Sequence, residues 1–317
     1  MPICHLPAMF GVLNFLIMKR HLALLVFTIL SLSNASAQSI TVEVLLDSEQ
    51  FIVGEAINAQ VRITNFSGQT LQLGSEDDWL TFALEGGPRK VVSQRSLVPA
   101  KGEFSLDSSK KGTRTVNIEP SFDLSRPGRY KLTASVRIPK LNSVVQCEPK
   151  SFNIINGTML WQQEFGLPSD PIKADTAPEF RRYTLLQVTK QKELVLYFRL
   201  SEAAGERVQK VFPIGALVSV STPQGQLDKY NNLHLLYQYS ARGFSYLMIN
   251  PDGVILSRET HELVGGSRPG LRPDDDGRIN VSGGVRRYTS TDLPPSTISE
   301  ATTASAPEAK TPEAGKE

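Results

Sequence analysis

The stretch 123-DLSRPGRYKLTASVRIP-139 decides the fold of the first half of the chain. It begins with turn residues and then alternates apolar and polar side chains as far as Ile138. Successive side chains on extended backbone point to opposite sides, so this alternation predicts one strand with a buried face and a solvated face. The predicted buried face carries Tyr130, Leu132, Ala134, Val136 and Ile138.

The turn before this strand predicts how the strand begins. Pro127 fixes its own φ, and Gly128 permits backbone angles that other residues avoid, which is the combination that a tight turn needs. Tyr130 follows shortly after the glycine and resembles the tyrosine corner of immunoglobulin-like (Ig-like) sandwiches, in which the hydroxyl bonds to nearby backbone. The second cysteine of such domains would fall at Leu132, so the resemblance implies a sandwich that lacks the inter-sheet disulfide.

Short alternating runs between turn residues extend over residues 38–156 and predict an antiparallel sandwich. Within them, 53-VGEAINAQVRITNFSG-68 and 121-SFDLSRPGRYKLTASV-136 resemble the Ig-like modules of exported bacterial proteins. They are similar to the BsuPI-type proteinase-inhibitor fold and to the sandwiches that accompany some secreted metallopeptidases. The resemblance implies a fold far more than a function, and no inhibitory loop carries over residue by residue.

Residues 1–37 are predicted to be a leader with a secretory signal. Lys19 and Arg20 precede the apolar run 22-LALLVFTILSL-32, and the small residues Ala35 and Ala37 predict cleavage before Gln38. The run is shorter than the roughly 20 apolar residues of a membrane-spanning helix, so we expect no membrane span. We therefore expect a soluble protein exported to the bacterial periplasm or beyond the cell, with translation starting at Met18 or Met1.

Charge argues against a nucleic-acid-binding protein, and the cysteine content argues against a disulfide-stabilised domain. The chain has 34 Lys and Arg against 32 Asp and Glu, and loss of Lys19 and Arg20 with the leader leaves 32 of each. A neutral chain is not typical of nucleic-acid binders, which carry a basic excess, so we expect no nucleic-acid partner. Of the two cysteines, Cys4 lies in the leader, so the lone Cys147 cannot form an intrachain disulfide and is expected in the core.

The second half predicts another β-rich domain, so the whole chain is expected to be all-β. Residues 157–178, with Trp161 and Phe165, are expected to be a linker or an irregular docking segment. Residues 179–295 hold six expected strands, the last three forming a meander over Leu233–Thr260. Residues 296–317 are poor in apolar residues and are expected to be a disordered tail. The six expected strands are RRYTLLQV, KELVLYFRL, ALVSVS, LHLLYQY, FSYLMI and VILSRET.

Candidate chemical motifs are incomplete. His261 begins 261-HELVG-265, where a zinc protease would need a second histidine in place of Gly265. His234 is expected to be a surface or satisfied core histidine. The run Asp274, Asp275, Asp276 before Gly277 is interpreted as an acidic turn, with an irregular calcium site as the alternative. We expect neither a metal nor a cofactor.

Binding residues are predicted from side-chain type. Two RRY segments, together with tyrosines of the meander, offer contact area and directed donors, which binding surfaces favour. Asp77 and Asp78 beside Trp79 could suit a sugar, although a core tryptophan after a loop is the simpler interpretation. The predicted contact residues are Arg181, Arg182, Arg286, Arg287, Tyr237 and Tyr239, with solvated strand ends and core tyrosines as the alternative.

These patterns favour an exported, non-catalytic binding or structural protein of the bacterial envelope, with a protein or glycan as its partner. Two other classes stay open. One is an enzyme, a hydrolase, with an unrecognised site in the second domain. The other is a proteinase inhibitor, by analogy of fold alone.

Overall fold

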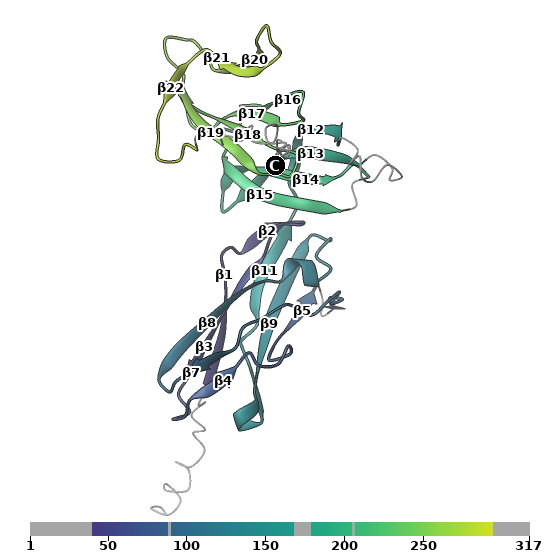
Figure 1. The fold of residues 1–317 in the computed structure, drawn as a ribbon, viewed down its shortest axis with the longest axis vertical. Helices are drawn as coiled ribbons and strands as arrows, with labels where there is room; N and C mark the ends of the chain where they lie inside the picture. Colours follow the sequence, from purple (N-terminus) through teal and green to yellow (C-terminus); the bar gives the residue numbers. More distant parts are fainter. Residues whose placement is uncertain (1–39, 88–89, 168–178, 205–206, 294–317) are drawn as a thin grey trace, which may run out of the picture.

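The computed structural model describes residues 40–87, 90–167, 179–204 and 207–293. The described chain is nearly all β and forms two domains that lie end to end along its longest axis (Figure 1). The predicted all-β fold with more than one domain is confirmed. The predicted leader and tail lie outside the described residues. Nowhere in the described ranges does a helix reach the length and apolarity that crossing a bilayer requires.

Two sheets face each other in the first domain, and a short strand pair lies beside them. One sheet has the order β1-β3-β8; the other follows β2-β11-β9-β5-β6, with β10 also pairing with β9. The third pair is β4 with β7. The bounds are β1 (Ile40–Leu46), β2 (Gln50–Ile52), β3 (Asn58–Asn65), β4 (Leu71–Leu73), β5 (Leu80–Gly86), β6 (Lys90–Val91), β7 (Phe104–Leu106), β8 (Lys110–Asn117), β9 (Gly128–Ile138), β10 (Ser143–Gln146) and β11 (Lys150–Ile155), with short 3-10 turns at Glu119–Ser121 and Pro139–Leu141.

The core of the first domain lies between its two sheets. Strand β9 is the central strand of the larger sheet, and its predicted buried face is confirmed because all five alternate residues from Tyr130 to Ile138 are buried. Trp79 is buried as well, and its indole Nε1 donates to the carbonyl oxygen of Ala100 at 2.7 Å. This burial rules out the sugar-plate interpretation of Trp79. Cys147 is a buried free thiol, as predicted, and burial raises its pKa.

Three layers of strands make up the second domain (Figure 1). A four-stranded sheet, β12-β13-β14-β15, packs on a five-stranded sheet, β16-β17-β18-β19-β22, and the pair β20-β21 covers the far face of the latter. The bounds are β12 (Thr158–Gly166), β13 (Phe180–Lys190), β14 (Glu193–Glu202), β15 (Val208–Ala216), β16 (Gln224–Leu227), β17 (Leu233–Gln238), β18 (Gly243–Ile249), β19 (Ile255–Glu262), β20 (Gly270–Pro273), β21 (Ile279–Ser282) and β22 (Val285–Arg287).

The meander is confirmed, and two other expectations for this half differ from the structure. Strands β17, β18 and β19 pair in sequence order over the predicted range. The expected strand ALVSVS is wrong, because the strand there is β15, which ends at Ala216 and leaves Val220 exposed. The segment expected to be irregular contains the regular edge strand β12, whose Phe165 docks into the domain core as predicted for that side chain.

The two domains are joined by apolar packing around one buried carboxylate. Ile52 of β2 packs against Leu186 and Tyr197 of the four-stranded sheet. Glu55, in the turn after β2, accepts hydrogen bonds from the Tyr197 hydroxyl at 3.0 Å and from its own domain's Ile52 amide at 2.8 Å. Lys190 forms an ion pair with the same carboxylate at 3.2 Å. The contact therefore combines apolar burial with a charge that is satisfied from both domains.

Candidate functional site

The arginines of the first RRY segment are held by contacts within the second domain. Arg181 pairs with Glu179 at 2.7 Å and with Asp252, in the turn after β18, at 3.1 Å. Its side chain is only 15% exposed. Arg182 binds Glu164 of the edge strand β12 and the carbonyl oxygen of Ala203. Both arginines thus join neighbouring parts of the fold, and two of the three guanidinium nitrogens of each already donate within the domain.

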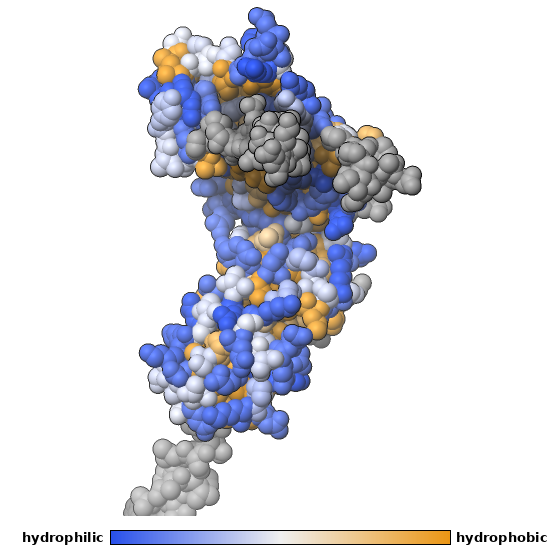
Figure 2. Space-filling view, in the orientation of Figure 1, coloured by the Kyte–Doolittle hydropathy of each residue, from blue (hydrophilic) through white to orange (hydrophobic). Residues whose placement is uncertain are grey.

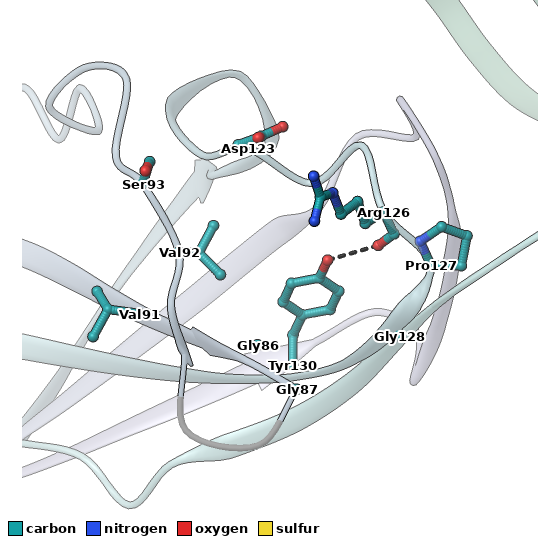
Figure 3. Close-up of a pocket in the computed structure, with 10 residues that line it drawn as sticks. All are labelled: Gly86, Gly87, Val91, Val92, Ser93, Asp123, Arg126, Pro127, Gly128 and Tyr130. Atoms are coloured by element: carbon teal, nitrogen blue, oxygen red, sulfur yellow. Dashed lines mark hydrogen bonds between the residues drawn. The ribbon is translucent and has the colours of Figure 1, made fainter.

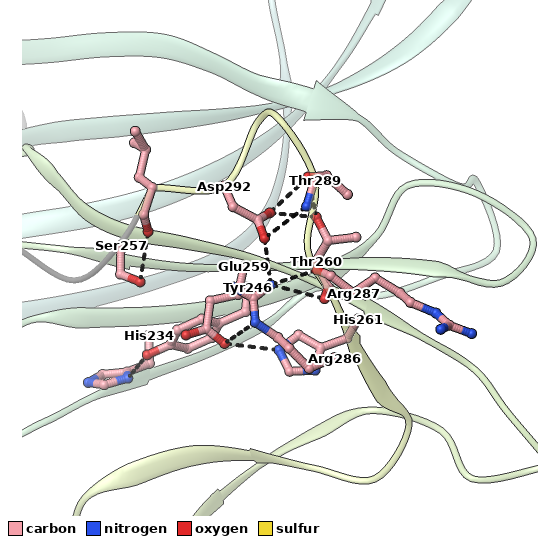
Figure 4. A network of polar contacts seen from close by, with 11 residues as sticks. His234, Tyr246, Ser257, Glu259, Thr260, His261, Arg286, Arg287, Thr289 and Asp292 are labelled. Atoms are coloured by element: carbon pink, nitrogen blue, oxygen red, sulfur yellow. Dashed lines mark hydrogen bonds and ion pairs between the residues drawn. The ribbon is translucent and has the colours of Figure 1, made fainter.

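The second RRY segment is tied down in the same way (Figure 4). Arg286 forms ion pairs with Asp292 at 2.9 Å and with Glu259 at 3.5 Å, and Arg287 pairs with Glu262 at 2.8 Å. These contacts hold β22 against β19. The two RRY segments lie on different sheets, and their ion pairs share no residue.

The two predicted tyrosines have different surroundings. Tyr237 is buried in the core between the two larger sheets, so the prediction that it contributes to a binding surface is wrong. The alternation of strand β17 directs Tyr237 inward together with Leu233 and Leu235. Tyr239 follows the strand and is 39% exposed. Of the six predicted contact residues, Tyr239 is therefore the one that offers a substantial free side-chain surface without an ion pair.

A row of polar side chains crosses the outer face of the five-stranded sheet (Figure 4). His234 Nδ1 lies 2.8 Å from the Tyr246 hydroxyl, and His234 Nε2 lies 3.3 Å from Asp228. Burial opposes the charge of Asp228, but its hydrogen bonds, chiefly those from Asn232, outweigh this and lower its pKa. Burial, and then the charges of Glu259 and Asp228, raise the pKa of Tyr246, which keeps its hydroxyl neutral. His234 is thus a satisfied core histidine, as expected.

The row continues through a second histidine. The Glu259 carboxylate lies 3.1 Å from His261 Nε2, within hydrogen-bond distance. This hydrogen bond lowers the pKa of Glu259, and the charge of Arg286 lowers it further. His261 is buried on the strand next to Tyr246. Each group in the row has its hydrogen-bonding partner inside the row. The arrangement stabilises the outer layer of the domain and leaves no activated nucleophile among these residues.

The acidic run forms a turn, as expected. The Asp274 carboxylate accepts hydrogen bonds from the amides of Asp276 and Arg278, which closes the loop between β20 and β21. Gly277 adopts φ +73°, which the turn requires. Within the described ranges no group of three or more His, Cys, Asp or Glu residues could hold a metal ion.

An open pocket lies at the end of the sandwich where β9 begins (Figure 3). Its volume is about 320 Å³. It is at the same end of the sandwich as the domain junction, because Ile154 of β11 pairs with Gly128, and Ile155 packs at the junction. The lining residues are Gly86, Gly87, Val91, Val92, Ser93, Asp123, Arg126, Pro127, Gly128 and Tyr130.

The floor of the pocket is the Tyr130 ring, which lies against the glycine that ends β5. The Tyr130 hydroxyl donates to the Arg126 carbonyl oxygen at 2.6 Å, which is the predicted corner hydrogen bond. The Tyr130 ring stacks on Phe152 with a centroid distance of 5.7 Å. A Cβ atom on Gly86 would lie 2.8 Å from Tyr130 Cε1, so a glycine is needed for this close approach.

Two segments far apart in the sequence form the walls of the pocket. The first wall is residues 91–93, and the second is the turn at residues 123–128. The amide of Val92 donates to the Leu84 carbonyl at 2.9 Å, which fixes the first wall to β5. The amide of Asp123 donates to the Ser93 carbonyl at 3.2 Å, which joins the first wall to the second. These backbone bonds hold the pocket open without any contribution from its exposed side chains.

The charged groups of the pocket are unequal. The Asp123 carboxylate accepts a hydrogen bond from Ser125 and pairs with Arg95 at 2.7 Å. These contacts, the Ser125 hydrogen bond above all, lower the pKa of Asp123. The Arg126 side chain extends along the pocket in Figure 3, and no hydrogen bond or ion pair to its guanidinium occurs in the described part of the chain. The pocket therefore combines apolar surface, a neutralised carboxylate and an available guanidinium.

Arg126 is a site residue that no pattern in the sequence predicts. Pro127, Gly128 and Tyr130 were interpreted through their role in the turn, and the arginine directly before them carries no motif of its own. The facing wall comes from residues 91–93, whose position depends on long-range backbone pairing. Proximity to the corner turn is the one local signal that pointed to this region.

Comparisons with known proteins identify no family. No protein-family model matches the chain, and no curated protein matches it. Among solved structures, the sporulation control protein Spo0M from Bacillus subtilis is similar over 56% of this chain and 91% of its own, at 9% identity and a TM-score of 0.29. A similarity this low carries no argument about fold or function.

Proposed function

We propose that this chain is an exported, non-catalytic binding protein of the bacterial envelope, and that its partner engages the pocket end of the sandwich. The observation that carries the proposal is the contrast between the two kinds of polar group. The second domain's histidines, carboxylates and RRY arginines are occupied by one another, whereas Arg126 lines an open pocket without a partner in the described residues. Satisfied groups stabilise a fold, and an unsatisfied donor beside apolar surface can bind.

The face of the molecule drawn in Figure 2 favours a local contact over a broad apolar one. Charged and polar residues cover most of the molecular face seen in Figure 2, and the apolar residues on it form small separate areas. Affinity would then depend on a few well-placed contacts in a pocket, as in other binding sites. The firm junction around Glu55 would hold the pocket in a fixed position relative to the second domain. The proposal includes that the first domain is related to the Ig-like modules of exported bacterial proteins.

Export and binding are tested on the secreted, mature protein. Sequencing of its N-terminus is expected to give Gln38; finding Met18 or an intact leader would contradict export through a cleaved signal. The mature chain, used as bait in an envelope extract, is expected to retain a defined partner. The same preparation is expected to leave panels of glycans, peptides and esters unchanged. Turnover of any of these would instead favour the hydrolase alternative.

A further inference from the structure

We propose that the corner pocket, defined by the ten lining residues above, binds a carboxylate carried on a small apolar group, with Arg126 as the residue that receives the carboxylate. The inference rests on the proposed binding function and names the ligand chemistry of the same site. Two kinds of ligand share this chemistry: a short free organic acid, and the C-terminal residue of a polypeptide.

Size and lining favour a small apolar body. The volume of about 320 Å³ is at the lower end of the range of roughly 300–1,000 Å³ for small-molecule pockets. Val91, Val92 and the Tyr130 ring supply apolar surface, and Gly86 and Gly87 add no side chain that would fill the space. The space suits a branched aliphatic or single aromatic group, whose burial would provide most of the binding free energy.

The charge of the pocket favours an anion. Arg126 brings a planar guanidinium whose paired N–H donors match the two oxygens of a carboxylate. Burial and then the charge of Asp123 raise the pKa of the Tyr130 hydroxyl, and the positive charge of Arg126 acts in the opposite direction, so both charges reach the base of the pocket. Arg126 is the only basic side chain in the described lining of this pocket. The nearby Arg95 lies outside the lining and is bound to Asp123.

The position of Asp123 selects a single negative charge over a phosphate or a cation. Asp123 already accepts hydrogen bonds from Arg95 and Ser125 through its Oδ1, so its charge is partly neutralised, and an incoming ammonium group would also meet the positive charge of Arg126. A doubly charged phosphate would gain one guanidinium but would face the Asp123 carboxylate. A monoanionic carboxylate matches one free guanidinium and keeps the pocket close to neutral.

The test uses the mature full chain labelled with ¹⁵N at glycine, because Gly86, Gly87 and Gly128 report directly from the pocket. N-acetyl-L-leucine, as a carboxylate probe, is expected to shift these three amide signals in a saturable way. N-acetyl-L-leucine amide is expected to bind about tenfold more weakly or worse, because it loses the charge-assisted contact. Equal affinity of the acid and the amide, or shifts confined to other glycines, would overturn the proposal.

Two variants separate the role of Arg126 from general charge. In Arg126→Gln the corner bond is kept, because Tyr130 bonds to the backbone oxygen of residue 126, and we expect a loss of about tenfold or more in affinity for the acid with the fold intact. Arg129→Gln removes the same charge from a residue outside the lining and is expected to bind like the wild type. If Arg126→Gln binds the acid as tightly as the wild type does, the assignment is wrong.

A second pair of probes distinguishes the source of the carboxylate. A pentapeptide ending in a free leucine would bind more tightly than N-acetyl-L-leucine if the natural ligand is a chain end, whereas 4-methylpentanoate would match N-acetyl-L-leucine if it is a free acid. Either result supports the pocket chemistry, and failure of all three acids overturns it. A partner captured by the mature chain despite that failure would leave the proposed binding function standing with another contact.

Discussion

The Tyr130 hydroxyl donates a hydrogen bond to the carbonyl oxygen of Arg126 at 2.6 Å, and this one contact connects the fold of the sandwich to its pocket. It closes the turn before β9, so the backbone of Arg126 is held in a fixed place beside the Tyr130 ring. The guanidinium itself makes no part of the bond. The residue that stabilises the corner and the residue proposed to bind the ligand can therefore be altered separately.

Substitutions of Tyr130 test the corner itself. Tyr130→Phe loses one net hydrogen bond and is expected to lower the free energy of unfolding by about 0.5–1.5 kcal/mol. Tyr130→Ala also removes a buried aromatic ring and is expected to cost about 3 kcal/mol or more. Urea-induced unfolding of both variants measures this difference. Equal and negligible changes in the midpoint would contradict the corner.

The junction of the domains depends on a second hydroxyl. Tyr197→Phe removes the donor to the Glu55 carboxylate, and Glu55→Gln removes the charge that pairs with Lys190. We expect each to destabilise the protein by about 1–3 kcal/mol, because each leaves a buried polar group with fewer partners. The double variant is expected to lose less than the sum by at least about 0.5 kcal/mol, as residues in contact do. Additive losses would show that the two residues act independently.

Asp228 makes stability depend on pH in the acidic range. Its folded-state pKa is lowered, so its contribution is present above its unfolded pKa of about 3.9 and is lost as the pH falls through the lower folded value. Asp228→Asn is expected to be less stable at pH 7 by about 1 kcal/mol. It is also expected to lose less stability than the wild type between neutral pH and roughly pH 3. Parallel pH profiles for the two proteins would contradict this role.

The RRY arginines are expected to act on stability. Arg181→Glu places a carboxylate between Glu179 and Asp252, so we expect a clear fall in the unfolding midpoint. Lys111→Glu, at an exposed position on β8, is the control for charge reversal and is expected to change the midpoint little. If Arg181→Glu is as stable as the control, its ion pairs contribute nothing to the fold.

The parts of the fold with strong local patterns could be predicted from the sequence. The period of two in β9 and the turn residues before Tyr130 determine the buried face and the corner, and the turn at Asn250–Gly253 separates two strands of the meander. Strand β12 was missed because it is an edge strand whose side chains are mostly exposed and carry no clear alternation. The segment ALVSVS has strand-like residues, but the partner of β14 is β15, which ends at Ala216. Pro213 is tolerated within β15 because β15 is an edge strand.

The site itself could be predicted only in part, because it depends on partners far away in the sequence. Nothing local to Arg181 indicates Asp252, and nothing local to Arg126 indicates Val92. Amphipathic side chains with charged heads are also ambiguous by type, since the same arginine can bind a ligand or join two strands. Pairing across the sheets decides between these roles.

Site-specific photo-crosslinking in the living bacterium tests the central claim most directly. Val91, at the pocket, and Val144, on β10 at the other end of β9, are exposed by 76% and 58% and are matched positions for a photoreactive amino acid. They are separated by roughly 20 Å along the strand direction, at about 3.3 Å per residue. The account predicts one defined crosslinked product from position 91 and none from position 144. Equal products from both positions, or a product from position 144 alone, would contradict it.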